Sequence, residues 1–67
     1  FASKLIEQAN LKGTRVGGIY ISNKHSNYFI NDGSGTFHDF IILLEIVKKK
    51  ILMKFSIELE EEVILIK

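Results

Sequence analysis

The sequence predicts a small two-layer α+β fold in the order helix, strand, strand, helix, strand, with helices packed on one face of a small sheet. Three observations predict it. A short stretch with helical spacing opens the chain, and two segments rich in aromatic and β-branched residues follow it. A long helical stripe then precedes a final apolar run. With 67 residues, the chain forms one domain, residues 1–67.

The N-terminal half predicts a helix followed by a hairpin. "SKLIEQAN" places Leu5, Ile6 and Ala9 on one side of a short helix. Ser3 is the expected N-cap, and Gly13 fits the turn beyond the end of the helix. "RVGGIYIS" and "NYFIN" each read as a strand, and the polar segment "SNKHSN" joins them as a broad hairpin loop. The two glycines inside the first strand indicate a bulge, simple packing, or close approach by a ligand or another backbone.

The second helix is predicted from about Phe37 to Phe55. The turn "NDGSGT" precedes it, Thr36 is the expected N-cap, and Asp39 completes a capping box. Four lysines crowd the C-terminal half, where cations suit the helix dipole; they predict a solvated face, with a phosphate or partner contact as the alternative. The core-facing stripe consists of Phe40, Leu43, Leu44, Val47, Ile51 and Phe55.

The chain carries more apolar surface than it can bury alone. The last strand, "VILI", is apolar at successive positions, so both of its faces should be covered, whereas helices in so short a chain cover one face. Ile41, Ile42 and Leu52 also lie off the main helical stripe. Exposed patches of this kind mark interfaces, so another domain or a second copy of this chain is expected to cover them.

Composition excludes several classes of function. The net charge of +1 argues against a nucleic-acid binder, and the longest unbroken apolar run, residues 40–44, is far too short for a membrane span. The chain has no Cys, which suits a reducing compartment, and with two His it offers no structural zinc site. Because the chain begins at Phe1 and not at Met, we expect it to be a piece of a longer protein.

Two places carry side chains suited to chemistry. Glu62 ends an acidic cluster just before the apolar strand, where partial burial would suit it to proton transfer; the alternative is an ordinary charge at a strand edge. His25 lies in the polar loop with Lys24 and Ser22, which offer hydrogen-bond donors to a phosphate or a sugar hydroxyl; the alternative is a polar turn without function. No set of metal ligands and no catalytic triad is evident.

Ordered motifs over nearly the whole chain resemble a known family. "KLIEQANLKGTRVGGIYISNKHSNYFIN", followed by a helix that ends "KFSIELEEEVILI", is similar to the C-terminal part of the UDP-N-acetylenolpyruvoylglucosamine reductases, flavoenzymes of bacterial cell-wall synthesis. The resemblance implies that the chain is the substrate-binding domain of a cytoplasmic enzyme. Two N-terminal domains would bind FAD, NADPH would reduce the flavin, and the substrate would be UDP-N-acetylglucosamine enolpyruvate. It implies no cofactor bound to this chain and no activity of the chain alone.

The resemblance also assigns roles to residues. Glu62 matches the Glu of the family's "PEV", which stabilises an enol-type intermediate, and is therefore the expected catalytic residue. His25 matches the His of the family's "KHA", which lines the UDP-sugar site, and Lys24 and Ser22 share its loop. Two positions differ from the family pattern, with Glu61 in place of Pro and Ile64 in place of Arg. The proton-donating Ser and its partner Arg are expected upstream of this chain.

A second class of function stays open from the sequence. The surplus apolar surface would equally serve a free-standing protein-interaction or dimerisation module without catalysis. Self-association of the chain is expected under either hypothesis, and neither predicts a membrane or nucleic-acid partner.

Overall fold

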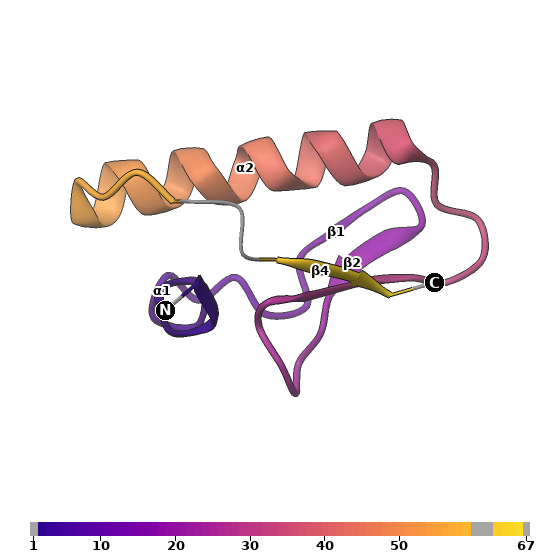
Figure 1. The fold of residues 1–67 in the computed structure, drawn as a ribbon, viewed down its shortest axis with the longest axis horizontal. Coiled ribbons are helices and arrows are strands. Elements are labelled where there is room, and N and C mark those ends of the chain that lie inside the picture. Colours follow the sequence, from indigo (N-terminus) through magenta and orange to yellow (C-terminus); the bar gives the residue numbers. More distant parts are fainter. Residues whose placement is uncertain (1, 60–62, 67) are drawn as a thin grey trace.

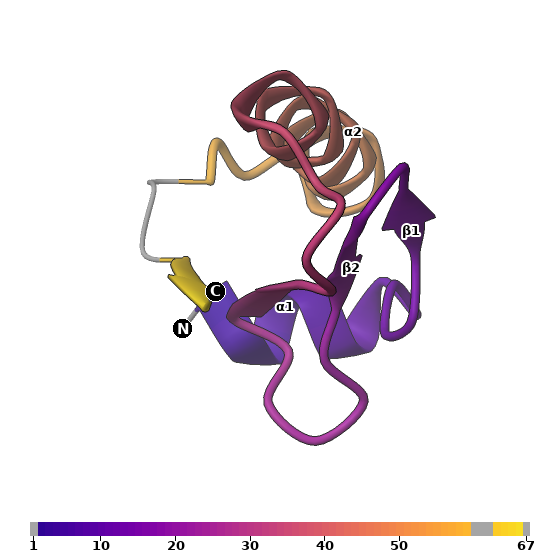
Figure 2. The same ribbon diagram turned by 90° about the vertical axis from the view of Figure 1, so that its right-hand side faces the viewer.

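The computed structural model describes residues 2–59 and 63–66 (Figure 1). The long helix α2 runs along one side of the molecule, and the shorter helix α1 lies below its C-terminal half, crossing it (Figures 1 and 2). The predicted two-layer α+β architecture is confirmed. The elements in chain order are α1 (Ala2–Gln8), β1 (Arg15–Val16), β2 (Ile19–Ile21), β3 (Tyr28–Asn31), α2 (Phe37–Phe55) and β4 (Ile64–Ile66).

The described strands form one mixed sheet in the order β1-β2-β3-β4. β2 pairs antiparallel with β3, which confirms the predicted hairpin around "SNKHSN". β4 pairs parallel with β3, with Tyr28 opposite Ile64. Because parallel neighbours need a long crossover, the chain passes through α2 before it returns to the sheet. β4 therefore occupies one edge of the sheet, and both β3 and β4 begin at the same end.

The prediction of one strand over residues 15–22 is wrong, because the chain turns at Gly17 and Gly18. β1 and β2 lie on either side of this turn and pair antiparallel. Gly17 has φ 54°, a conformation that glycine adopts without strain. The Gly18 carbonyl accepts the Asp32 N–H at 2.9 Å, and a Cβ on Gly18 would collide with the backbone of Gly35. Of the predicted alternatives, the structure shows close approach by another part of the backbone.

Helix α2 begins and ends at the predicted residues. Thr36 Oγ1 accepts the Asp39 N–H and an Asp39 carboxylate oxygen accepts the Thr36 N–H, both at 3.1 Å, so the predicted capping box is present. The Asp39 carboxylate also accepts the Gly18 N–H at 3.5 Å, which links the start of the helix to the turn between β1 and β2. These hydrogen bonds, above all the one from the Thr36 N–H, lower the pKa of Asp39. The helix ends where Ser56 adopts a left-handed conformation.

The core lies between α2 and a surface formed by the sheet and α1. α1 begins at Ala2, so Ser3 lies within its first turn and the predicted N-cap is wrong. Gly13, with φ 81°, lies in the turn beyond this helix as predicted. Of the predicted α2 stripe, Phe40 and Phe55 are partly buried. The buried apolar residues are Ala2, Ile6, Leu11, Ile19, Ile21, Phe29, Leu43, Leu44, Val47, Ile51 and Leu59.

The predicted surplus of apolar surface is confirmed at both places. On β4, Leu65 packs against the core, but Ile64 and Ile66 point to the other side of the sheet and remain 46% and 39% exposed. This follows from the alternation of side chains along a strand that is covered on one face. Ile41, Ile42 and Leu52 are exposed on α2.

An exposed ion pair joins β1 to the end of the hairpin. Arg15 Nη1 donates to Asp32 Oδ2 at 2.8 Å, and the Arg15 guanidinium lies 4.7 Å from the centroid of the Tyr20 ring. Asp32 also accepts hydrogen bonds from the Ser34 hydroxyl at 2.7 Å and the Ser34 N–H at 2.9 Å. The Ser34 hydroxyl first, then the Ser34 N–H and Arg15, lower the pKa of Asp32 from 3.8 to about 2.

We expect this carboxylate to make the stability of the chain sensitive to acid. A carboxyl whose pKa is lower in the folded state stabilises the fold above its unfolded pKa, and that contribution is lost as the pH falls from about 4 to about 2. The Asp32→Asn variant should therefore be less stable than the parent at pH 6, and the difference should shrink by pH 2. Urea unfolding followed by circular dichroism at several pH values checks this. A difference that does not change with pH would contradict it.

Candidate functional site

The loop between β2 and β3, residues 22–27, is held by hydrogen bonds to its own backbone. Ser22 Oγ accepts the N–H groups of Lys24 and His25 at 3.0 and 3.1 Å. At the base of the loop, the Ser22 N–H donates to the Tyr28 carbonyl, and the Tyr28 N–H donates to the His25 carbonyl, both at 2.9 Å. Short polar side chains of this kind commonly satisfy nearby backbone groups in turns. The shape of the loop is therefore fixed by hydrogen bonds within the chain.

The predicted binding residues of this loop differ in orientation. Lys24 and His25 are exposed, and the His25 ring lies against Tyr28, with 5.0 Å between centroids and 46° between planes. Ser22 is only 7% exposed and Ser26 only 3%. Lys24 and His25 thus face solvent, whereas Ser22 faces the backbone of the loop.

Parallel pairing brings the chain segment that enters β4 to this loop. Asn27, the last loop residue, accepts the Ile64 N–H on its carbonyl at 2.8 Å, and the start of β4 lies beside the start of β3 (Figure 1). The predicted catalytic residue Glu62 lies outside the described residues, as do Glu60 and Glu61. What the structure shows is that the neighbouring Val63–Ile64 segment meets the end of the His25 loop.

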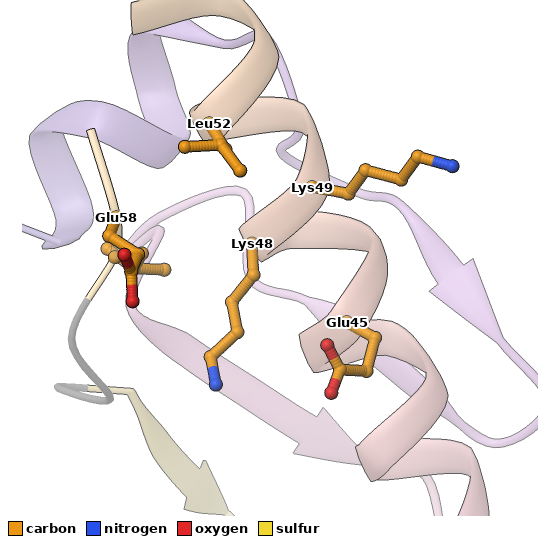
Figure 3. Close-up of a pocket in the computed structure, with 6 residues that line it drawn as sticks. Glu45, Lys48, Lys49, Leu52 and Glu58 are labelled. Carbon is orange, nitrogen blue, oxygen red and sulfur yellow. The ribbon is translucent and has the colours of Figure 1, made fainter. Parts of the chain in front are cut away.

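Glu58, the first of the clustered acids, lies on a different surface. Together with Leu59, it lines a pocket of about 280 Å³ between α2 and the segment that follows it (Figure 3). The other lining residues are Glu45, Lys48, Lys49 and Leu52, and none of the lining residues belongs to the loop 22–27. Two acids and two lysines balance one another there, so the pocket has no net charge to attract an ion. Glu58 and most of the described lysines of α2 are exposed, as predicted for a solvated face.

The described part of the chain holds neither clustered metal ligands nor a helix that could cross a membrane. Within it, no group of three or more His, Cys, Asp or Glu side chains is arranged to hold a metal ion. Across residues 2–59 and 63–66, neither helix has the length and apolar character needed to cross a membrane.

Sequence reasoning missed two residues that shape the loop. Tyr28 was assigned only to a strand, yet its ring contacts His25. Asn27 was assigned to the junction of the loop and the strand with no partner named, and its carbonyl pairs with β4. The first contact joins residues three apart in the sequence, so the turn at His25 was the local signal for it. The second depends on a strand far along the chain, so no local pattern could have indicated it.

The fold and this loop define a small α+β domain that presents an ordered polar loop at the end of its sheet where two parallel strands begin. Residues 1–66 match the family described as "UDP-N-acetylenolpyruvoylglucosamine reductase, C-terminal domain". The chain belongs to this family, which confirms the resemblance found in its motifs.

Curated relatives agree with this assignment. The UDP-N-acetylenolpyruvoylglucosamine reductase of Fusobacterium nucleatum is 48% identical over 67 residues, which are 100% of this chain and 24% of that protein. The reductase of Clostridium novyi is 49% identical over 63 residues, 94% of this chain and 20% of that protein. That of Aquifex aeolicus is 47% identical over 66 residues, 98% of this chain and 22% of that protein. The chain spans about a quarter or less of the length of these relatives.

Proposed function

We propose that the chain is the substrate-binding C-terminal domain of a UDP-N-acetylenolpyruvoylglucosamine reductase, acting on UDP-N-acetylglucosamine enolpyruvate in the bacterial cytoplasm. The match to the family over residues 1–66 supports this most directly. In this proposal the hydride would come from FAD, which N-terminal domains of the same enzyme would hold and NADPH would reduce. We assign no residue of this chain to either cofactor.

The roles proposed for this chain are to bind the substrate and to stabilise charge that develops on it. His25 and Lys24 face solvent on an ordered loop, as residues that contact a UDP-sugar would need to. Glu62 immediately precedes Val63, and the segment from Val63 meets the end of that loop through the hydrogen bond from Ile64 to Asn27. This supports a site shared by the loop and Glu62. A carboxylate in a site closed off from water acts more strongly on developing charge than one in solvent.

Exchange of this chain into a relative tests the proposal. In the Fusobacterium nucleatum reductase, this chain would replace the segment that it matches; we call this protein the chimera. We expect the chimera to reduce UDP-N-acetylglucosamine enolpyruvate with NADPH, because the chain would supply every C-terminal group that the reaction needs. The control lacks the matched segment altogether. A folded chimera that binds FAD but does not turn over substrate would contradict the proposal.

The chain by itself should be colourless and should not oxidise NADPH. We expect this because the flavin site and the proton donor are assigned to other domains of the enzyme. Absorbance in the visible region where flavins absorb and an NADPH oxidation assay check the purified chain. Flavin bound in a one-to-one ratio would show that this chain holds part of the cofactor site.

The exposed apolar residues favour a second candidate, a module that binds protein. Four apolar side chains are each more than a third exposed in the chain alone: Ile64 and Ile66 on β4, and Ile41 and Leu52 on α2. Apolar surface of this kind commonly marks a site where a partner binds. In the proposed enzyme, the N-terminal domains are that partner. If no such domains accompany the chain, the partner is a second copy of the chain.

We therefore expect the isolated chain to self-associate at high concentration. Sedimentation velocity from micromolar to millimolar concentration measures this, and the Ile64→Thr/Ile66→Thr double variant should shift the association to higher concentration. His38→Gln, which changes an exposed polar residue of α2, is the control. A monomer over the whole range would rule out a dimerisation module.

A further inference from the structure

We infer that Tyr28 and Ser22 are positioning residues for His25: Ser22 fixes the backbone of the loop, and Tyr28 fixes the imidazole before the substrate arrives. The inference rests on the proposed function, because it assumes that His25 contacts the substrate. It assigns Ser22 a different role from the direct substrate contact expected from the sequence, and it assigns a role to Tyr28, for which the sequence indicated none.

The Ser22 hydroxyl is committed to the loop itself. It accepts two consecutive backbone N–H groups, those of Lys24 and His25, at 3.0 and 3.1 Å. With 7% of the residue exposed, little of Ser22 is accessible to a ligand as large as a nucleotide sugar. Removal of its hydroxyl would leave both N–H groups without this acceptor and free the backbone at His25 to move. Ser22 thus acts on the substrate through the loop.

Tyr28 gives the imidazole a fixed surface to lie on. Tyr28 opens β3, where its carbonyl accepts the Ser22 N–H and its own N–H donates to the His25 carbonyl. Pairing with Ile64 fixes it from the other side. Its ring therefore stands on a strand held by both neighbours and contacts the His25 ring at 5.0 Å between centroids. A side chain ordered before binding loses less conformational entropy when the ligand arrives.

Steady-state kinetics of the chimera tests the positioning roles of Tyr28 and Ser22. We expect Tyr28→Leu and Ser22→Ala each to raise KM about 2- to 10-fold, with a smaller change in kcat, because each loosens a group that contacts bound substrate. Tyr28→Phe keeps the ring and Ser22→Thr keeps the hydroxyl, so both should restore the parent KM. Tyr20→Leu is the matched control, because Tyr20 lies on the neighbouring strand and contacts Arg15. If Tyr28→Leu does not fold, Tyr28→Val keeps the strand propensity and takes its place.

A double variant separates positioning from a general structural effect. In the background of His25→Ala, Tyr28→Leu should raise KM no further, since the group that it positions is gone. Additive effects of the two changes, or an unchanged KM in Tyr28→Leu while His25→Ala raises it, would overturn the inference and leave the proposed function standing. If His25→Ala itself leaves KM unchanged, the binding role proposed for His25 fails, and the inference fails with it.

Discussion

Glu62→Gln in the chimera is expected to slow reduction of the substrate about 10²- to 10³-fold, while the preceding reaction with NADPH keeps its rate. A preorganised group that stabilises charge in the transition state typically contributes a factor of this size. Glu62 is proposed to act only where charge develops on the enolpyruvyl group, so it cannot influence a step that precedes substrate reduction. Stopped-flow absorbance separates the two half-reactions, because NADPH bleaches the flavin and the substrate restores its colour.

The other acids of the cluster provide matched controls for Glu62. Glu58 is exposed and lines a pocket in which two acids and two lysines cancel in charge, and no residue of the His25 loop lines that pocket. Glu58→Gln should therefore react at the parent rate in both half-reactions. Glu60→Gln should do the same, because the family resemblance gives the catalytic role to Glu62 and not to Glu60. If Glu60→Gln is the slow variant, or if Glu62→Gln restores the flavin colour as fast as the parent, then the catalytic role belongs elsewhere.

His25→Ala in the chimera should raise KM more than it lowers kcat. A donor on the loop is expected to contact the substrate equally in the ground state and the transition state, and loss of such uniform binding appears in KM. One hydrogen bond of this kind contributes about 1 to 3 kcal/mol, and each 1.4 kcal/mol is a factor of about ten. Initial rates over a wide range of substrate concentration give both constants.

The second histidine of the chain offers a control for this result. His38 is exposed on the first turn of α2, on an element that does not belong to the loop, so His38→Ala should leave both constants unchanged. A large fall in kcat with an unchanged KM in His25→Ala would mean that His25 takes part in the chemistry and does not merely hold the substrate.

Sequence patterns predicted α2 well because each of its signals is local. Thr36 and Asp39 are three residues apart, and the apolar stripe repeats within the helix. The helix ends at Phe55, the last residue of that stripe. The hairpin around His25 was predictable for a similar reason, since a polar turn between two strand-like segments needs no distant partner. The structure confirms both.

Other features depended on contacts that local patterns do not contain. Gly17 and Gly18 turn the chain because residues 34–35 and the start of α2 pack against them, whereas a continuous strand would fit the same letters. Among the site residues, His25 and Lys24 lie exposed on the predicted loop, and their binding role stays a prediction. Ser22 turns inward instead, because its hydroxyl accepts the N–H groups two and three residues on, a local hydrogen bond that short polar side chains make in turns. Glu62 stays a prediction.

The parallel pairing of β4 with β3 has a consequence for the order of folding. The hairpin that carries His25 closes through neighbours in the sequence, but β4 can join it only after the chain has spanned residues 32–63, which costs loop-closure entropy and slows long-range contacts. A ligand held by both the loop and the segment before β4 would bind only the fully folded chain, and would stabilise it by mass action. Substrate binding and completion of the sheet would then be thermodynamically linked, so the enzyme's own substrate would oppose the detachment of its edge strand.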